Sequence, residues 1–487
     1  MRKKLCVCTC CGLEERWIEQ FCTNLLPITD LFVINLTQFA DRSEELLRKF
    51  IPEDKLVLVK NKWEDSFALA RNQALEHVPD DMDYFLYIDL DEVLTTDSFP
   101  VIEKILNSEE RATYIVTIYN LLDENTNSNA FLVYPRFISL RNNKGELTGP
   151  YFTSTVHNQL EMKNGDRKLL PILRSPISIL HYGYALSRGE MAKKHARSEA
   201  LLRAQIEKDH DNFFPHLNLA QLLRAKGDSK GCIEHALEVL RTIKESIDKG
   251  EPTYEHALLM ALDQLATSYL AIGRPDIALP YAQRAIKIKP DYLDALLCLG
   301  NIYLELRDLD GAESWYKRYL FVRTTYNEQK DDANLILNHL NSSFLALYNL
   351  GMTYGVRGDH KKANEYFYKC YKEEPNFRDT FIKYLYSTKQ MGDIKKMNKD
   401  ISIYLDKNPD KAYIIYEFLG DLGLEDCQVE LSKFYYYQAS FINEIADEVH
   451  KKIINNKWNT IKKEFGDVAG SFFDTYSAQQ KTINKIK

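Results

Sequence analysis

The hydrophobic positions of the first two hundred residues form short runs that alternate with amphipathic stretches. Four apolar runs have the length of β-strands, and three of them precede a segment whose apolar residues have helical spacing. In chain order the runs are KLCVCTC, DLFVINL, KLVLV and YFLYI, and the helical segments are 15–25, 42–50 and 67–76. This alternation predicts a largely parallel sheet covered by helices, with ligands bound at the carboxyl ends of its strands.

The pattern changes near residue 205, where it becomes helical and repetitive. Small residues recur at fixed offsets, which lets paired helices approach closely, and aromatic residues fill the gaps between neighbouring pairs. The pattern resembles tetratricopeptide repeats, although helical hairpins without a binding groove would share it. The matching positions, the first two sets of them 34 residues apart, are Ala266, Tyr269, Ala278 and Ala282; Gly300, Tyr303, Ala312 and Tyr316; and Gly351, Tyr354, Ala363 and Phe367.

The length of the chain allows more than one hydrophobic core. It has 487 residues, of which 45% are hydrophobic, and chains of this size normally split into domains. We predict an α/β domain over 1–205, an all-α repeat solenoid over 206–430 and capping helices over 431–487. Such arrays offer concave surfaces for peptides or proteins, so we expect a protein ligand or a homodimer through the repeats.

Composition argues against several classes of partner. The net charge is −7 and no compact basic run is present, so we expect no nucleic-acid partner. No window approaches the ~20 apolar residues of a membrane span, and the first residues do not form a secretory signal, so we expect a cytoplasmic location. The nine cysteines are expected to be reduced, and the alternating thiols of CVCTCC suit the buried face of a strand better than a metal site.

Two aspartates follow the fourth apolar run directly. In an extended segment Asp89 and Asp91 project to the same side, because side chains alternate with a period of two. Like charges this close are costly unless a cation lies between them, and a divalent metal would also neutralise a diphosphate. The competing interpretation is a solvated loop in which Asp89 caps the next helix. The pair alone does not decide between the two.

Three further motifs accompany this pair within residues 1–205: KWEDSFALARNQAL precedes it, and VHNQL and ILHYGY follow it. This ordered set resembles family 2 glycosyltransferases of the GT-A fold, a Rossmann-like α/β fold. It implies that Asp91 helps hold a metal on the diphosphate of a nucleotide sugar. It also implies that Asp89 contacts the ribose of that donor or the metal.

Bacterial members of this family that are fused to tetratricopeptide repeats are the most similar to this chain. They include enzymes that glycosylate cysteine or serine in bacteriocin peptides. Their motifs correspond here to Trp63, Asp65, Phe67, Ala70, Arg71 and Asn72, and to the histidine of VHNQL. The resemblance therefore implies that Asp65, Arg71 and Asn72 belong to the nucleotide-sugar site.

Two positions depart from the family pattern. Asn35 stands where members commonly carry an aspartate that binds the nucleobase. An asparagine can still form a hydrogen bond with uracil, although without a charge, so we predict Asn35 as a nucleotide contact. Asn158 replaces the glutamate of the common VHEQL, and any role of that carboxylate toward the acceptor is lost.

The catalytic base and a further metal ligand are predicted from the remaining polar residues. The candidates for the base are His157, Glu92 or another acidic residue whose position the sequence does not reveal, because neutral imidazole and carboxylate both accept protons near neutral pH. His157 could instead bind the acceptor. His181, at the end of ISILHYGY, is predicted as a metal ligand together with Asp91. For both histidines a purely structural role, with the ring bonded to backbone carbonyls, is the alternative.

These predictions combine into one function. The resemblance implies an inverting, metal-dependent hexosyltransferase that uses Mn²⁺ or Mg²⁺ and a nucleotide-sugar donor, expected to be a UDP-sugar. The acceptor is expected to be a peptide, a protein or a glycan. The alternative is a tetratricopeptide-repeat adaptor whose glycosyltransferase domain is inactive. Nucleotide binding distinguishes the two, because only the enzyme needs it.

Overall fold

The computed structural model describes residues 2–121, 129–153, 159–162, 170–183, 188–250, 254–326, 335, 337–426, 428–442 and 456. Contacts between residues divide the chain into two compact units, Met1–Asn349 and Leu350–Lys487. Among the described helices, none combines the length and the apolar character needed to cross a membrane.

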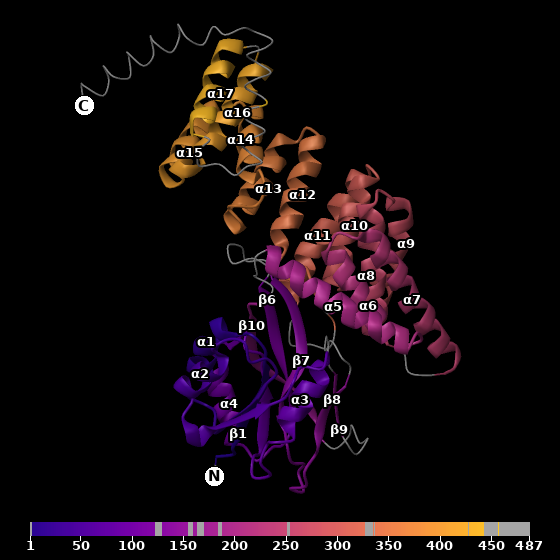
Figure 1. Cartoon of the computed structure of the whole chain (residues 1–487). Coiled ribbons are helices and arrows are strands. Elements are labelled where there is room, and N and C mark those ends of the chain that lie inside the picture. Colours follow the sequence, from indigo (N-terminus) through magenta and orange to yellow (C-terminus); the bar gives the residue numbers. More distant parts are fainter. Residues whose placement is uncertain are drawn as a thin grey trace, which may run out of the picture. The chain divides into compact units, whose positions relative to one another are not determined.

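The N-terminal part is an α/β domain built on an eight-stranded sheet (Figure 1). The strands lie in the order β3-β2-β1-β4-β7-β6-β10-β5. The four predicted strands are all parallel, since β1 pairs with β2 and β4, and β2 pairs with β3. The rest of the sheet is mixed, because β7 is antiparallel to both β4 and β6. The strand bounds are β1 Leu5–Cys11, β2 Leu31–Leu36, β3 Leu56–Lys60, β4 Tyr84–Tyr87, β5 Glu92–Leu94, β6 Thr113–Leu121, β7 Asn129–Ser139 and β10 Ile172–His181.

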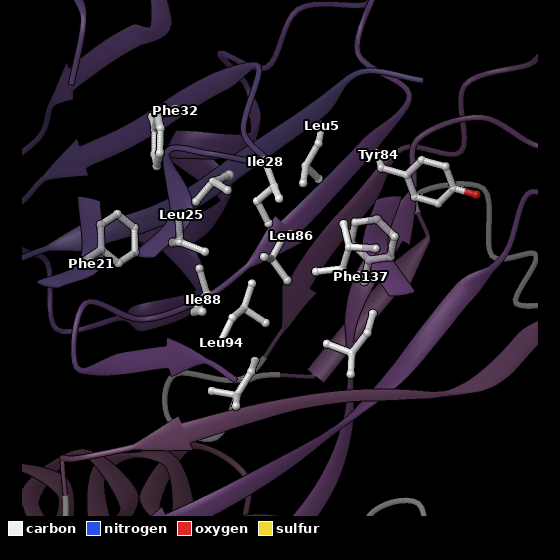
Figure 2. Packing of buried hydrophobic residues seen from close by; sticks show 14 of the residues in the cluster. Leu5, Phe21, Leu25, Ile28, Phe32, Tyr84, Leu86, Ile88, Leu94 and Phe137 are labelled. Carbon is white, nitrogen blue, oxygen red and sulfur yellow. The ribbon is translucent and has the colours of Figure 1, made fainter. Parts of the chain in front are cut away.

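Helices cover both faces of this sheet, as the sequence predicts. Side chains on alternate positions of β1 enter different cores: Leu5 and Val7 pack with α1, α2 and α4, whereas Cys6 and Cys8 pack with α3. Figure 2 shows the first of these cores, in which the rings of Tyr84 and Phe137 are stacked at 4.9 Å. The burial of Cys6 and Cys8 confirms that these two thiols fill a strand face, whereas Cys10 is partly exposed. The bounds are α1 Glu15–Leu25, α2 Ser43–Phe50, η1 Glu53–Lys55, α3 Phe67–Leu75 and α4 Ser98–Leu106, with a separate pair of strands β8 Pro150–Thr153 and β9 Gln159–Met162.

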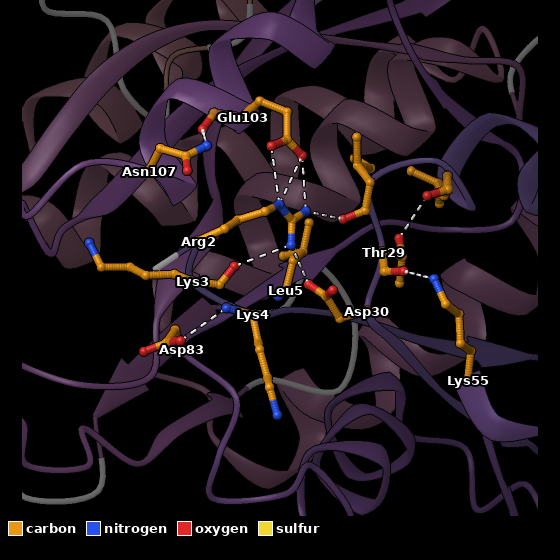
Figure 3. Close-up of polar contacts among 12 residues, drawn as sticks. Arg2, Lys3, Lys4, Leu5, Thr29, Asp30, Lys55, Asp83, Glu103 and Asn107 are labelled. Carbon is orange, nitrogen blue, oxygen red and sulfur yellow. Dashed lines mark hydrogen bonds and ion pairs between the residues drawn. The ribbon is translucent and has the colours of Figure 1, made fainter.

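Arg2 fixes the amino end of the sheet (Figure 3). Its guanidinium donates to Asp30 Oδ2 at 2.7 Å, to Glu103 Oε1 at 2.9 Å and to the carbonyl of Ile28 at 2.8 Å. Asp30 Oδ2 also accepts from the backbone N–H of Leu5 at 2.8 Å. These bonds join the start of β1 to α4 and to the loop before β2. They hold the edge of the sheet at which the strands begin, while the edge at which they end carries the site described below.

The rest of the described chain is helical. Helices α5 to α11, and α12 up to Asn349, lie in the first unit, and the remainder of α12 and the helices from α13 on lie in the second. The predicted domain limits at residues 205 and 430 fall inside α5 and α17. Most of 431–487 lies outside the described residues. The division into three domains therefore stays a prediction. The bounds are α5 Arg188–Lys208, α6 Phe213–Ala225, α7 Ser229–Asp248, α8 Glu255–Ala271, α9 Pro275–Ile288, α10 Leu293–Glu305, α11 Leu309–Thr325, α12 Ser343–Val356, α13 His360–Glu373, α14 Thr380–Gln390, α15 Ile394–Lys407, η2 Pro409–Lys411, α16 Ala412–Glu425 and α17 Val429–Ile442.

A glycine facing an aromatic ring recurs in the helix pairs. A Cβ on Gly300 would lie 2.5 Å from Cδ1 of Tyr316, and a Cβ on Gly351 would lie 2.7 Å from Cδ1 of Phe367. Each ring lies 16 positions after its glycine, and Gly420 and Tyr436 repeat the same spacing and contact. This last copy was missed in the sequence pattern. The predicted small positions are buried at Ala278, Gly300, Ala312, Gly351 and Ala363.

We expect Gly300→Ala to lower the free energy of unfolding by about 1 to 3 kcal/mol. The added methyl would overlap the ring of Tyr316, which is fully buried and donates a hydrogen bond to Asn301 Oδ1 at 2.7 Å, so the ring must move within a close-packed core. Gly355→Ala is the control, because a Cβ there meets no heavy atom within 4 Å. It should be neutral or slightly stabilising. Urea unfolding of both variants measures the difference, and equal stability would exclude overpacking at Gly300.

Candidate functional site

Three carboxylates gather where β1 and β4 end. These strands pair in parallel, with Cys8 opposite Tyr87, so the residues that follow them share one edge of the sheet. Asp89 and Asp91 follow β4, and Glu14 follows β1. Burial raises the pKa of Glu14 to about 7, and the negative charges of Asp91 and Asp89 add to this effect. The positive charges of Arg16 and Arg197 act in the opposite direction and are outweighed. Glu14 is not among the residues predicted from the sequence, although its place after a parallel strand is a usable signal.

Asp89 is held by Arg71. The guanidinium Nη2 donates to both carboxylate oxygens, at 3.2 and 3.3 Å, and the Tyr87 hydroxyl donates to Oδ1. The guanidinium also lies over the ring of Tyr87, 4.0 Å from its centroid. Burial alone would raise the pKa of Asp89, but the charges of Arg71 and Arg136 outweigh it and hold this pKa at about 2. Asp89 is therefore ionised across the physiological range and fixed in one orientation.

Asp91 faces His181 across the edge of the sheet. His181 Nε2 lies 3.4 Å from Asp91 Oδ2, and His181 Nδ1 lies 2.7 Å from Asn120 Oδ1. Since an amide oxygen accepts, Nδ1 carries the proton, and Nε2 points toward Asp91. Burial acts against the charged form of each group, yet their mutual hydrogen bond and attraction lower the pKa of Asp91 and raise the pKa of His181. The structure thus places side by side the two residues that the sequence predicts as metal ligands.

Gly183 keeps the space between this pair clear of side chains. A Cβ built on Gly183 would overlap Asp91 Oδ2 and would lie 2.6 Å from His181 Nε2. A carboxylate oxygen and an imidazole nitrogen thus lie close together beside the Cα of Gly183, and both are ligands that divalent metals accept. Within the described ranges, no group of three or more His, Cys, Asp or Glu side chains could hold a metal ion. A metal bound by Asp91 and His181 would therefore take its other ligands from the donor and from water.

Asn35 is not part of this surface. Its side chain is completely buried and donates to the carbonyl of Ala70 at 2.8 Å and to Gln73 Oε1 at 3.0 Å, while its Oδ1 accepts from Asn61 at 3.1 Å. These bonds fasten β2 to α3 and to the segment after β3. In this position the amide is engaged by the protein's own groups, and the nucleotide contact stays a prediction that these bonds do not support.

Glu92 is also enclosed. Its side chain has no exposed surface, and it accepts from Arg136 Nη2 at 2.9 Å and from the backbone N–H of Asp89 at 2.7 Å. A general base must reach the proton it removes, and Glu92 in this position does not reach an acceptor that arrives from solvent. Its observed contacts hold Asp89 and the start of β5 in place.

Two of the remaining predicted residues, Asn72 and Asp65, bond to neighbouring segments of the chain. Asn72 pairs with the backbone of Phe152, accepting at 2.7 Å and donating at 2.9 Å, and so fixes β8. Asp65 is exposed, has a left-handed φ of 53° and accepts from Trp63 Nε1 at 2.9 Å. His157 lies outside the described residues, four positions after the last residue of β8 in the sequence.

Comparison with known proteins agrees with both halves of the chain. Residues 6–159 match the family model described as Glycosyl transferase family 2, and residues 264–328 and 345–377 match tetratricopeptide-repeat models. The chain therefore joins a family 2 glycosyltransferase domain to tetratricopeptide repeats. The first match contains Asp89, Asp91 and Arg71, so the acidic edge lies within the glycosyltransferase domain.

Other similarities are partial. Human DnaJ homolog subfamily C member 3 is 28% identical over 134 residues, which are 28% of this chain and 23% of that protein. The general transcriptional corepressor ssn6 of Schizosaccharomyces pombe is 28% identical over 27% of this chain and 11% of its own length. The chain thus spans less than a quarter of the length of these relatives.

Similar solved structures include a tetratricopeptide repeat protein from Parabacteroides merdae, with 16% identity, a TM-score of 0.36, and coverage of 56% of this chain and 93% of that one. Another is YrrB, described as a TPR protein with an unusual peptide-binding site, with 16% identity, a TM-score of 0.31, and coverage of 44% and 95%. Similarity at this level supports no functional assignment.

Proposed function

We propose that the protein transfers a sugar from a nucleotide diphosphate sugar, a UDP-sugar in our hypothesis, to an acceptor, and that Mn²⁺ or Mg²⁺ assists. The observation that carries this proposal is the Asp91 and His181 pair around the space at Gly183, beside the Asp89 and Arg71 pair. Both pairs lie at the carboxyl edge of the sheet of a family 2 glycosyltransferase domain. That edge is where such sheets bind ligands.

Each of these side chains has a chemical task in the proposal. Asp91 Oδ2 and His181 Nε2 would hold the metal, whose charge would neutralise the diphosphate that leaves. Asn120 fixes the tautomer and orientation of His181 through its bond to Nδ1. Arg71 and Tyr87 orient Asp89, which retains acceptor capacity for a hydroxyl of the donor. The proton acceptor is not among these groups, and His157 remains the predicted base.

The charge of the site favours a cationic ligand. Glu14, Asp89 and Asp91 lie near one another, and their mutual repulsion contributes to the raised pKa of Glu14. Two of these carboxylates have a strong cationic or imidazole partner within the domain, as described above. Binding of a divalent cation would relieve the remaining repulsion, and a diphosphate bound to that cation would then be neutralised.

The repeats support a protein-interaction role, and in our proposal they receive a peptide or protein acceptor or a second copy of the chain. The alternative is an adaptor with an inactive domain. One observation favours it: the side chains of Asn35 and Glu92, two of the predicted site residues, are enclosed by other contacts.

Nucleotide binding tests the proposal directly. With Mn²⁺ present, we expect UDP at about a hundred times its Kd to stabilise the protein by about 2.7 kcal/mol, which raises the melting temperature by several degrees. Chelation with EDTA should abolish the shift, because without the metal the carboxylates of Asp89 and Asp91 would repel the diphosphate. Uridine is the control, since it lacks the phosphates. A protein that responds to no nucleoside diphosphate, with or without metal, would support the adaptor.

A further inference from the structure

Helix α5 (Arg188–Lys208) follows the glycosyltransferase domain, and one of its faces lies against that domain. Glu190, Lys194 and Arg197 are spaced by four and three residues, so they share a helix face. Glu190 Oε1 pairs with Arg16 of α1 at 2.8 Å, and Arg197 lies 5.6 Å from the ring centroid of Phe67 in α3. Between them, Lys194 Nζ donates to the carbonyl of Gly183 at 2.9 Å. Three side chains of α5 therefore contact the glycosyltransferase domain.

The two cations on this face lie around the acidic cluster. The Cβ position that would overlap Asp91 Oδ2 is 2.9 Å from Lys194 Nζ, so the ammonium group borders the same space as Asp91 and His181. Arg197 is exposed and close enough to Glu14 for its charge to favour the carboxylate form. Both cations thus face the place where the proposed diphosphate binds, and neither comes from the residues that match the family 2 model, 6–159.

The far half of α5 belongs to the repeat array. Leu202 is 1% exposed and packs in a cluster with residues of α6, α7 and α8, which include Leu219, Cys232 and Leu265. Glu199 is bound by Lys226, which directly follows α6. The position of the helix is therefore set by the array at one end and meets the donor site at the other.

We infer that α5 supplies Lys194 and Arg197 as phosphate-binding cations of the donor site, so that the repeat array is a structural part of that site. The inference rests on the proposed function. A diphosphate brings at least two further negative charges to an edge that already carries three carboxylates. Lysine binds phosphate as a point charge and arginine binds it in a fork geometry, and both suit this ligand. The array would then govern donor binding as well as the choice of acceptor.

The first test measures nucleotide affinity by calorimetry on the full chain with Mn²⁺. Lys194→Gln and Arg197→Gln should each weaken binding of UDP about tenfold or more and leave the weak binding of uridine unchanged. Lys193→Gln is the control, because Lys193 is an exposed neighbour on a different face of α5. A UDP affinity that matches wild type in both variants would overturn the inference while the proposed function stands. Wild-type protein that binds neither UDP nor GDP would overturn both.

The second test separates the array from the cations. Leu202→Ala removes a buried contact between α5 and the array, at a distance of two turns from Lys194 along the helix. It should weaken the binding of UDP severalfold, because Lys194 and Arg197 lose their fixed positions. Leu385→Ala is the control, since Leu385 is equally buried but lies in α14 of the second unit. Circular dichroism confirms that both variants are folded at the assay temperature. Equal UDP affinity in the two variants would show that the array does not position α5.

Discussion

Replacement of Asp91 by asparagine is expected to reduce sugar transfer about a hundredfold or more and to leave the protein folded. Loss of a residue that only supports a metal ligand costs 10- to 100-fold in metal affinity or activity, and Asp91 is the proposed ligand itself. Asparagine keeps the shape of the side chain and removes its charge. The side chain is 21% exposed and pairs with His181 alone among the ion pairs of the described residues, so little of the fold depends on it.

The measurement is transfer rate against Mn²⁺ concentration, with the melting temperature recorded in parallel. Asp97→Asn is the matched control, because Asp97 is exposed, lies six residues further along and makes no capping hydrogen bond with α4. It should behave as wild type. A fully active Asp91→Asn protein would refute the central assignment of the site. Loss of activity together with loss of folding would indicate a structural role for Asp91 instead.

The parts of the fold that the sequence predicts are those with a regular period. The first four strands and their helices appear as short apolar runs and amphipathic stretches, and the structure confirms them as parallel strands covered on both faces. The repeats around Gly300 and Gly351 are visible because both glycine and ring are present in each copy. The copy at Gly420 is hard to recognise in the sequence, because α14 and α15, the helices before it, have no such glycine.

The site was less accessible from sequence, because it depends on which strands are neighbours. Chain order places Glu14 far from Asp89, and only the pairing of β1 with β4 brings them to one edge. His181 reaches Asp91 because β10 pairs with β5, the strand that follows the aspartates. The motif resemblance assigns Asp89, Asp91, Arg71 and His181 to the site, and the structure places Arg71 against Asp89 and His181 against Asp91. Their roles stay predictions.

The same resemblance assigns Asn35 to the nucleotide, whereas the structure buries its side chain against α3. Local hydrogen bonds decide whether a polar residue faces the site or the core, and those bonds depend on α3, which comes much later in the chain. Glu92 shows the same effect, since its burial is compensated by Arg136 from β7. A motif therefore identifies the elements of the site more securely than the orientation of each side chain.

Gly183→Ala is expected to reduce transfer about a hundredfold with little change in melting temperature. The new methyl would meet the ends of three side chains, Asp91 Oδ2, His181 Nε2 and Lys194 Nζ, and no backbone atom is among its three nearest neighbours. Side-chain ends move at small cost, and Gly183 is not among the described residues with positive φ, so alanine fits the backbone. The fold should therefore tolerate the change. The site should not, because displacements of about 1 Å at reacting groups can cost 10²-fold.

Two controls and two measurements make this prediction specific. Gly189→Ala and Gly12→Ala add the same methyl nearby, but a Cβ at Gly189 meets nothing within 4 Å and one at Gly12 meets only Gln38 Nε2 at 3.7 Å. Both should retain activity. The methyl of Gly183→Ala would push Asp91 Oδ2 and His181 Nε2, the proposed metal ligands, out of position. The Mn²⁺ concentration needed for UDP binding should therefore rise, and added Mn²⁺ should restore part of that binding. If Gly183→Ala binds UDP and Mn²⁺ as wild type does, the space between Asp91 and His181 is not the metal site, and the role of this pair must be limited to the packing of β10 against β5.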